Sequence, residues 1–344
     1  MFTYKRWLLY GATGRTGTLI AEEAVARGHR PLLAGRDPER LRRLAERLDL
    51  AWVAGPAAES ARLIGDVSLV LLTAGPFGAT APAVLRACLD AGVHYLDIAN
   101  EIPVVTATLA ADEEARRRGI TVLPAVGFGT VASDGLARYV ADQVPGAVRL
   151  DLAVLPGTDG SSAGAKASTM LALAGGGRTR HDGRLLRTRL GAGSRRQHTP
   201  IGERTLVPVP TGDLVVTGHT TGIPDISVSF PVPMPPLAAK LAMPVLPMLA
   251  WAAGKLPQRA TPSGTATKAP AAVNSYLWAQ ATAADGRTAQ AWVRTGEGYA
   301  YTARSAVLAV EATLRSEPLG ATTVARAFGS NLSFEAGGEL LATA

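Results

Sequence analysis

The chain has 344 residues, of which 47% are hydrophobic and 18% charged, and this balance excludes an intrinsically disordered protein. A single cysteine, Cys88, excludes a disulfide framework and a cysteine-ligated metal site, and we expect it in the core. The net charge is +7, and most of the excess lies in residues 178–204, which hold eight arginines against two acids. The length predicts two domains, and no signal peptide is evident, so we expect a cytoplasmic protein.

The first predicted unit is a strand, a glycine turn and a helix. Residues 6–10 are apolar enough for a buried strand, and residues 18–27 are expected to form a helix. Glycines let the backbone approach a pyrophosphate, and the N–H groups at a helix start attract its oxygens. The turn between them, spaced G-x-x-G-x-x-G, therefore predicts a dinucleotide site. The expected cofactor contacts are Gly11, Thr13, Gly14, Arg15, Thr16 and Gly17.

The second predicted strand, residues 31–34, is followed by residues that distinguish the two nicotinamide cofactors. An acid at this point binds the ribose 2′-hydroxyl of NAD, whereas an arginine accommodates the 2′-phosphate of NADP. Arg36 comes first here, and Arg15 can reach the same region, so the sequence predicts NADPH. Asp37 keeps NADH possible. Asp37 and the proline after it also begin the next helix.

Strand and helix signals go on alternating to about residue 145, which predicts an α/β fold with a doubly wound parallel sheet of Rossmann type. The apolar run 67–72 is typical of a central strand. The turn after this strand is expected to lie against the cofactor, through Thr73, Ala74, Gly75, Pro76 and Phe77. Further expected elements are a helix at 80–91, a strand at 94–99, a helix up to residue 118 and a strand at 121–126.

These motifs, in this order and spacing, resemble those of the saccharopine dehydrogenase-like oxidoreductases. The likeness is greatest to the short branch that includes trans-acting enoyl reductases of lipid and polyketide assembly. It is carried by the glycine turn, residues 34–37, 73–77 and 94–97, Glu101, residues 127–129, and Ser133 with Asp134. The resemblance implies an NADP(H)-binding Rossmann domain at residues 1–147, completed by about residues 303–344. It also implies a second α+β domain at residues 148–302 for substrate binding and dimerisation, and hence a homodimer.

The substrate side departs from the family pattern. The family has an acid after Gly-Phe, where this chain has Gly129. The family also shows a Gly-Thr pair ahead of a serine, where this chain has Lys166 and Ser168 in a Gly-Ala-Lys-Ala-Ser run. The resemblance therefore does not fix the substrate.

The second half has weaker signals. The expected elements are strands at 149–155, 204–209 and 214–218, a short helix at 168–174, a kinked apolar helix at 237–256, a hairpin at 276–294 and a helix at 303–314. Prolines and lysines interrupt the apolar stretch, so we expect no membrane span. The segment from Arg178 to Arg204 is either a solvated loop or a docking surface for an acidic carrier protein or a phosphate-bearing substrate. No recognition motif accompanies it, so we expect no nucleic-acid partner.

Polar side chains at strand ends are the candidates for chemistry. No tyrosine has a lysine four residues later, so the Tyr-x-x-x-Lys pair of short-chain dehydrogenases is missing, and the five scattered histidines predict no metal site. Reduction of an activated C=C or C=N bond needs little acid–base machinery. The catalytic candidates are Tyr95, Asp97, Glu101 and Lys166, and the candidates for substrate contact are Asn100, Phe128 and Ser168.

Three functions stay open at this point. The first is an NADPH-dependent reductase of a C=C bond in a hydrophobic or carrier-bound acyl substrate, of the kind found in secondary metabolism. The second is an NADPH-dependent imine reductase or a saccharopine-type amino-acid dehydrogenase, although the second half is poor in the acids that such a substrate would need. The third is a redox sensor that binds NADP(H) without catalysis. All three share the cofactor and the fold.

Overall fold

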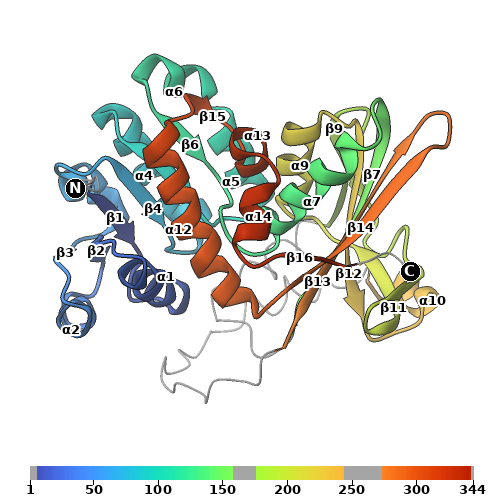
Figure 1. The fold of residues 1–344 in the computed structure, drawn as a ribbon, viewed down its shortest axis with the longest axis horizontal. Coiled ribbons are helices and arrows are strands. Elements are labelled where there is room, and N and C mark those ends of the chain that lie inside the picture. The colour runs from blue at the N-terminus through green and yellow to red at the C-terminus, as the bar shows by residue number, and fades with distance from the viewer. Residues whose placement is uncertain (1–5, 158–175, 244–272, 342–344) are drawn as a thin grey trace.

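The computed structural model describes residues 6–157, 176–243 and 273–341 of the chain. Within these ranges, two β-sheets lie side by side, each with helices packed against it (Figure 1). The predicted helix at 168–174, both Lys166 and Ser168, and most of the predicted helix at 237–256 lie outside the described residues.

Seven of the described strands form the first sheet, and all of its pairs are parallel. Their order is β15-β6-β5-β4-β1-β2-β3. The strands are β1 (Trp7–Tyr10), β2 (Leu32–Gly35), β3 (Trp52–Ala54), β4 (Leu69–Leu72), β5 (His94–Asp97), β6 (Thr121–Leu123) and β15 (Gly320–Ala321). Every residue of β1 and β4 is buried, as expected for central strands covered on both faces. The strand order reverses between β1 and β4, which is where ligands bind in such sheets.

The helices of the first sheet begin and end at local sequence signals. They are α1 (Arg15–Ala26), α2 (Pro38–Leu48), η1 (Ala57–Glu59), α3 (Ser60–Ile64), α4 (Phe77–Ala91), α5 (Ile102–Leu109) and α6 (Asp112–Arg118). The Asp37 side chain caps α2 as predicted, accepting a hydrogen bond from the Arg40 N–H at 3.0 Å. The single helix predicted up to residue 118 is wrong. The chain forms α5 and then α6, whose first turn holds three acids that favour a new helix start.

Nine of the described strands form the second sheet, and β12 and β7 are its parallel pair. Seven of them follow the order β10-β11-β12-β7-β13-β14-β16, and β8 pairs with β12 and β9. They are β7 (Ala147–Leu155), β8 (Gly177–His181), β9 (Arg184–Thr188), β10 (Arg195–Thr199), β11 (Gly202–Pro208), β12 (Asp225–Val232), β13 (Ser275–Ala283), β14 (Thr288–Thr295) and β16 (Glu339–Leu341). Two helices, α7 (Thr130–Asp142) and α9 (Asp213–Thr221), pack on each other and against this sheet. The predicted hairpin is confirmed as β13 and β14.

Two expectations about the second half are corrected. The solvated loop expected from Arg178 to Arg204 is wrong, because this segment forms β8, β9, β10 and the start of β11. The alternative for the same segment, a docking surface, stays a prediction. The strand predicted at 214–218 is wrong, because these residues lie in α9. All five of them are buried, and a short apolar run that is buried on every side does not distinguish a helix from a strand.

The apolar stretch that was expected as a kinked helix enters the described residues only at α10 (Pro236–Ala242). This short helix leaves Leu237 and Leu241 largely exposed. Among the helices that the structure describes, none combines the length and the apolar character needed to cross a membrane.

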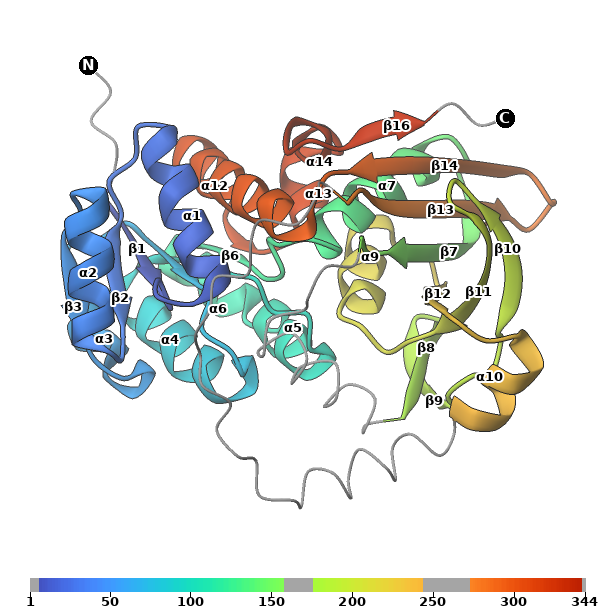
Figure 2. The ribbon, with the colours of Figure 1, turned by 90° about the horizontal axis from the view of Figure 1, so that it is seen from below.

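The end of the chain contributes to both sheets. It holds α12 (Gly298–Ser316), β15, α13 (Val324–Phe328), α14 (Asn331–Glu335) and β16. Helix α12 packs along α1, and Figure 2 shows both on one side of the first sheet with α4 and α5 on the other. Strand β15 pairs with β6 of the first sheet, whereas β16 pairs with β14 of the second. The domain boundaries at residues 147 and 302 stay predictions.

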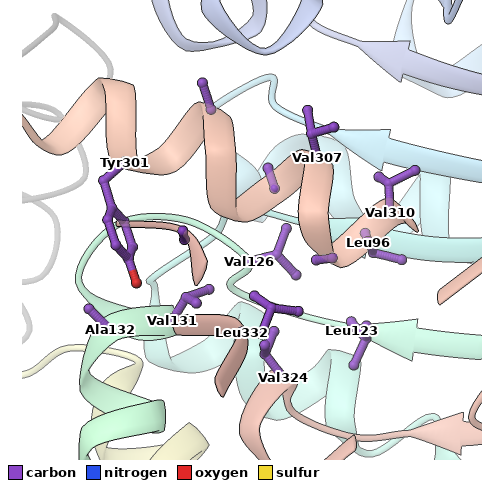
Figure 3. Close-up of a cluster of buried hydrophobic side chains, with 14 of the residues drawn as sticks. Leu96, Leu123, Val126, Val131, Ala132, Tyr301, Val307, Val310, Val324 and Leu332 are labelled. Carbon is purple, nitrogen blue, oxygen red and sulfur yellow. The ribbon is translucent and has the colours of Figure 1, made fainter. Parts of the chain in front are cut away.

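One continuous hydrophobic core joins the two halves. It contains Leu96 and Leu123 from the first sheet and Val307 and Val310 from α12 (Figure 3). Val131 at the start of α7 belongs to the same core. Helix α12 therefore lies between the cofactor-binding half and the second sheet.

Candidate functional site

The glycine turn has the close contacts that a dinucleotide site requires. Gly11 adopts φ +92°, and a Cβ there would lie 2.7 Å from the Ala74 nitrogen. A Cβ on Gly17 would lie 2.2 Å from the Gly11 carbonyl oxygen, so neither position admits a side chain. Gly14 is exposed and is the N-cap of α1, with no side chain capping the helix. The first N–H groups of α1 are therefore available to phosphate oxygens.

Arginines gather beside this turn. Arg36 is exposed just after β2. Burial of Tyr10, at the end of β1, raises the pKa of its hydroxyl, and the positive charge of Arg36 partly opposes this shift. Arg40 donates to the Thr13 carbonyl oxygen at 2.7 Å. A cavity of about 310 Å³ lies here, lined by Thr13, Thr18, Arg40, Arg43, Leu44 and Arg47. Residues of this kind fit a nucleotide with an added phosphate, and the sequence pointed only to Arg36 and Arg15.

The turn after β4 is held in place by hydrogen bonds. Thr73 donates to the Tyr10 carbonyl oxygen through both its N–H, at 2.8 Å, and its hydroxyl, at 2.9 Å. The Thr80 hydroxyl donates to the Ala74 carbonyl oxygen at 2.6 Å, and the Gly75–Pro76 peptide bond is cis. Residues 73–77 therefore form a fixed wall at the switch point of the sheet.

Two of the four catalytic candidates are buried beneath the sheet edge. The Tyr95 hydroxyl donates to Asp97 Oδ2 at 2.8 Å, and Asp97 Oδ1 accepts the N–H groups of Ala99 and Ala125, each at 2.9 Å. Both side chains have 0% exposure. Burial raises the pKa of Asp97 to about 6, while these three hydrogen bonds oppose the shift. The pair orders the backbone that follows β5 and β6, and a catalytic role for it stays a prediction.

Asn100 joins the two halves of the molecule. Its Nδ2 donates to Asp213 Oδ2 at 3.3 Å, and its carbonyl oxygen accepts the Gly212 N–H at 2.8 Å. The Ser133 hydroxyl donates to Asp213 Oδ1 at 2.5 Å. Asp213, at the start of α9, is fully buried. The sequence does not predict it as a site residue, because residues 214–218 after it have the pattern of a strand. The loop after β5 is thus attached to α7 and α9.

A second buried carboxyl group lies next to Ser133 in the sequence. Asp134 accepts hydrogen bonds from the Thr220 hydroxyl at 2.5 Å and the Ala325 N–H at 2.8 Å. Burial raises the pKa of Asp134 to about 7, and these hydrogen bonds oppose the shift. Asp134 therefore connects α7, α9 and α13 in the interior.

An apolar cavity opens between the loops after β4 and β5 and the start of β8. Its volume is about 500 Å³. It is lined by Pro76, Gly78, Ala79, Glu101, Ile102, Pro103, Val104, Gly176, Arg178 and Pro210. Two predicted residues, Pro76 and Glu101, therefore meet in one cavity, next to Asn100. This cavity is the interdomain pocket.

Phe128 is placed differently from what a substrate contact would suggest. Its ring packs edge-on against Tyr301, with ring centroids 6.0 Å apart. Its N–H donates to the Thr302 hydroxyl at 2.9 Å. Phe128 is not among the residues that line the interdomain pocket. Its substrate contact stays a prediction, as do the roles of Lys166 and Ser168.

The basic segment presents unpaired charge. Four of its arginines are exposed, and no described carboxylate lies within ion-pair distance of any of them: Arg184, Arg187, Arg189 and Arg196. Arg42 of the first domain differs, since it pairs with both Glu39 and Glu46. Arg187 lies opposite Arg178 in the β8–β9 pair, and Arg178 lines the interdomain pocket. Positive charge thus continues from the surface to the edge of this pocket.

One grouping of possible metal ligands occurs among the described residues: His181, Asp182 and Asp225. His181 and Asp182 are exposed and Asp225 is partly buried, and His181 Nδ1 already lies 2.9 Å from Asp225 Oδ1. Arg149 and Arg180 line the cavity beside them, and their charges disfavour a cation.

Comparison with known proteins supports a nucleotide-binding site in the first half of the chain. Residues 7–123 match the family described as "Saccharopine dehydrogenase NADP binding domain". The trans-acting enoyl reductase of Mycobacterium ulcerans is 30% identical over 138 residues, which cover 37% of this chain and 33% of that protein. The saccharopine dehydrogenase-like oxidoreductase of Homo sapiens is 25% identical over 182 residues, covering 45% and 42%. This chain thus spans about a third of the length of the first relative.

A solved structure shares the whole fold. The apo histidine-tagged saccharopine dehydrogenase (L-Glu forming) from Saccharomyces cerevisiae matches with a TM-score of 0.65 and 13% identity, over 98% of this chain and 100% of that chain. The predicted Rossmann sheet with a second, mixed sheet is thereby confirmed. The resemblance seen in the motifs is confirmed as well, and so is NADP(H) as the cofactor. Residues 7–123 are thus similar to the saccharopine dehydrogenase NADP-binding domain, and the chain as a whole shares the fold of saccharopine dehydrogenase.

Proposed function

We propose that this chain is an NADPH-dependent oxidoreductase that reduces an activated C=C bond in a hydrophobic or carrier-bound acyl substrate. The match to an NADP-binding domain supports the cofactor. The partial likeness to trans-acting enoyl reductases supports the reaction. Bound NADPH would supply the hydride.

The interdomain pocket is the observation that carries this proposal. Ten residues of the described part of the chain line it, and six of them are apolar, namely Pro76, Ala79, Ile102, Pro103, Val104 and Pro210. At about 500 Å³ it is in the range of small-molecule sites. It lies where the loops after β4 and β5 meet the second sheet. An acyl chain would remove these apolar surfaces from water, which stabilises the complex.

The same pocket argues against an amino-acid substrate. A saccharopine-type substrate carries several carboxylate and ammonium groups, and each needs a charged or hydrogen-bonding partner once it leaves water. Among the described residues that line the pocket, Glu101 and Arg178 are the two that are ionisable. An acyl thioester needs fewer polar partners, so it fits this lining better.

Glu101 is our candidate for the residue that delivers the proton to the substrate after hydride transfer. It lines the pocket, whereas Tyr95 and Asp97 are fully buried beneath it. Glu101 is also the residue before α5, and Oε2 of its carboxylate accepts the Asn100 N–H at 3.1 Å. The hydrogen bond from Asn100 to Asp213 would hold the Glu101 carboxylate next to the second domain.

The exposed arginines of β9 and the residues next to it are the proposed docking surface for an acidic carrier protein. Their charge is not neutralised by described carboxylates, and it continues through Arg187 and Arg178 to the pocket. A phosphate on the carrier's arm would find a cation near the pocket. Triple charge reversal (Arg184→Glu, Arg187→Glu and Arg189→Glu) should lower kcat/KM for a carrier-bound substrate and spare a small thioester. Reversal of Arg117 and Arg315, which are exposed elsewhere, should affect neither.

The pocket assignment is tested with α,β-unsaturated acyl thioesters of increasing chain length. We expect kcat/KM for NADPH consumption to rise by up to about fourfold per methylene until the pocket is full. Val104→Trp should remove this dependence. Val148→Trp, at an exposed valine of β7, is the matched control. A kcat/KM that does not change with the length of the acyl chain in the unaltered protein would contradict the assignment of the pocket.

The two other functions give different results. An imine reductase would consume NADPH with cyclic imines and not with the thioesters. A redox sensor would bind NADPH and oxidise it with neither. A homodimer, a role in secondary metabolism and a cytoplasmic location stay predictions.

A further inference from the structure

Arg15 of the glycine turn is in contact with a residue from the far end of the chain. Its guanidinium carbon lies 3.9 Å from the centre of the Tyr299 ring, a cation–π geometry. Its Nη2 also lies 4.0 Å from Glu297 Oε1. Arg15 is the first residue of α1, whereas Glu297 and Tyr299 belong to the start of α12. The family match ends at residue 123, so it includes neither of these partners.

The first turn of α12 is itself firmly placed. The Glu297 carboxylate caps the helix by accepting the Ala300 N–H at 2.9 Å. A Cβ on Gly298 would lie 3.2 Å from the Phe128 ring, so this glycine allows the turn after β6 to pack closely. The Thr302 hydroxyl accepts the Phe128 N–H at 2.9 Å. Tyr299 is therefore presented to Arg15 from a turn that is fixed on both sides.

An arginine at the start of α1 gains from such support. A free arginine side chain samples many rotamers, and ordering it at a phosphate costs conformational entropy. A ring beneath the guanidinium and a carboxylate beside it restrict those rotamers before a ligand arrives. A guanidinium has five N–H donors, and a contact of its carbon with a ring does not use them up, so an arginine held in this way can also bind phosphate oxygens.

We propose that Tyr299 is a positioning residue for the cofactor, which holds the Arg15 guanidinium where it binds the cofactor's phosphates. This role concerns nucleotide binding alone, so it holds whether or not the chain is a reductase. It also means that the cofactor site includes a residue that follows β14 of the second sheet directly. The second domain would thereby contribute to NADPH affinity through α12.

A double-mutant cycle on NADPH binding by the full chain tests the proposal. Arg15→Met should weaken NADPH binding by about tenfold or more, the value of a charge-assisted hydrogen bond. Tyr299→Leu should weaken it by about two- to fivefold, the value of a half-exposed cation–π contact. The double variant should bind as Arg15→Met alone does, because Tyr299 acts through Arg15. Tyr299→Phe keeps the ring and should keep the affinity.

Two results would overturn the proposal. One is an unchanged dissociation constant in Tyr299→Leu. The other is a double variant in which the two losses multiply, since Tyr299 would then act on the cofactor independently of Arg15. Tyr139→Leu is the control, because Tyr139 also makes an edge-on aromatic contact, with Phe334, but lies on α7. Its NADPH affinity should not change, and thermal unfolding of every variant shows that the fold is kept.

Discussion

The Tyr95 hydroxyl donates a hydrogen bond to Asp97 Oδ2 over 2.8 Å, at a point where neither side chain is exposed to solvent. The other carboxylate oxygen accepts two backbone N–H groups, from Ala99 and Ala125. One side chain at the end of β5 thus satisfies three donors and fixes two loops. The loops in question carry Asn100 on one side and Phe128 on the other. We therefore expect Tyr95 and Asp97 to hold the loops of the site in place.

Removal of this carboxyl group should therefore destabilise the fold. Asp97→Ala leaves the Tyr95 hydroxyl and two backbone N–H groups without their acceptor, and we expect a loss of about 3 kcal/mol in the free energy of unfolding. Asp97→Asn keeps an acceptor for the backbone groups and should lose less than half of that. Urea unfolding measures both. Equal losses for the two variants, or none, would show that these hydrogen bonds do not hold the loops.

Asp134 should make stability depend on pH. In the folded chain, burial raises its pKa from 3.8 to about 7, so the folded state binds this proton more tightly than the unfolded state. The contribution is complete below about pH 4 and is lost as the pH rises through 7. The original chain should thus lose stability relative to Asp134→Asn between pH 4 and pH 7. Parallel unfolding free energies for both proteins across this range would contradict the assignment.

The glycine turn should tolerate a methyl group at one glycine and not at another. A Cβ on Gly17 would lie 2.2 Å from the Gly11 carbonyl oxygen, so Gly17→Ala must displace the start of α1 from the turn. We expect at least tenfold weaker NADPH binding. Gly14→Ala is the matched variant, because its Cβ would meet the same oxygen at an ordinary 3.4 Å. Fluorescence titration with NADPH compares them, and similar affinities would show that the close contact does not matter.

Arg36 should decide between the two nicotinamide cofactors. Its exposed guanidinium follows β2, where a 2′-phosphate is recognised in this architecture. Arg36→Ala should raise the Kd for NADPH by about tenfold or more and leave the Kd for NADH within about twofold. If the Kd values for NADPH and NADH rise by the same factor, Arg36 does not bind the 2′-phosphate. Arg40, which donates to the Thr13 carbonyl oxygen, would then be the next candidate.

Local signals predicted most of the first sheet and its helices. The cap of α2 by Asp37, the glycine turn and the β13–β14 hairpin all depend on neighbouring residues, and all are present in the structure. The sequence does not predict helix α9, because its first six residues are all buried and the helical period of apolar and polar residues is therefore absent.

Contacts between distant residues could not be predicted in this way. Asn100 meets Asp213 across the two domains, and Arg15 meets Tyr299 from opposite ends of the chain. Each contact depends on how α9 and α12 pack, and no local pattern in the sequence records that packing. The candidate site was therefore predicted on its cofactor side and missed on the side that the second domain supplies.

Transfer of deuterium from labelled NADPH tests the central proposal most directly. The full chain would be given an α,β-unsaturated acyl thioester and a cyclic imine together, and mass spectrometry would locate the label. We predict deuterium at the β-carbon of the reduced acyl chain, because hydride adds there and a proton completes the reduction at the α-carbon. Label found only in the reduced imine, or in neither product, would contradict the proposed reaction.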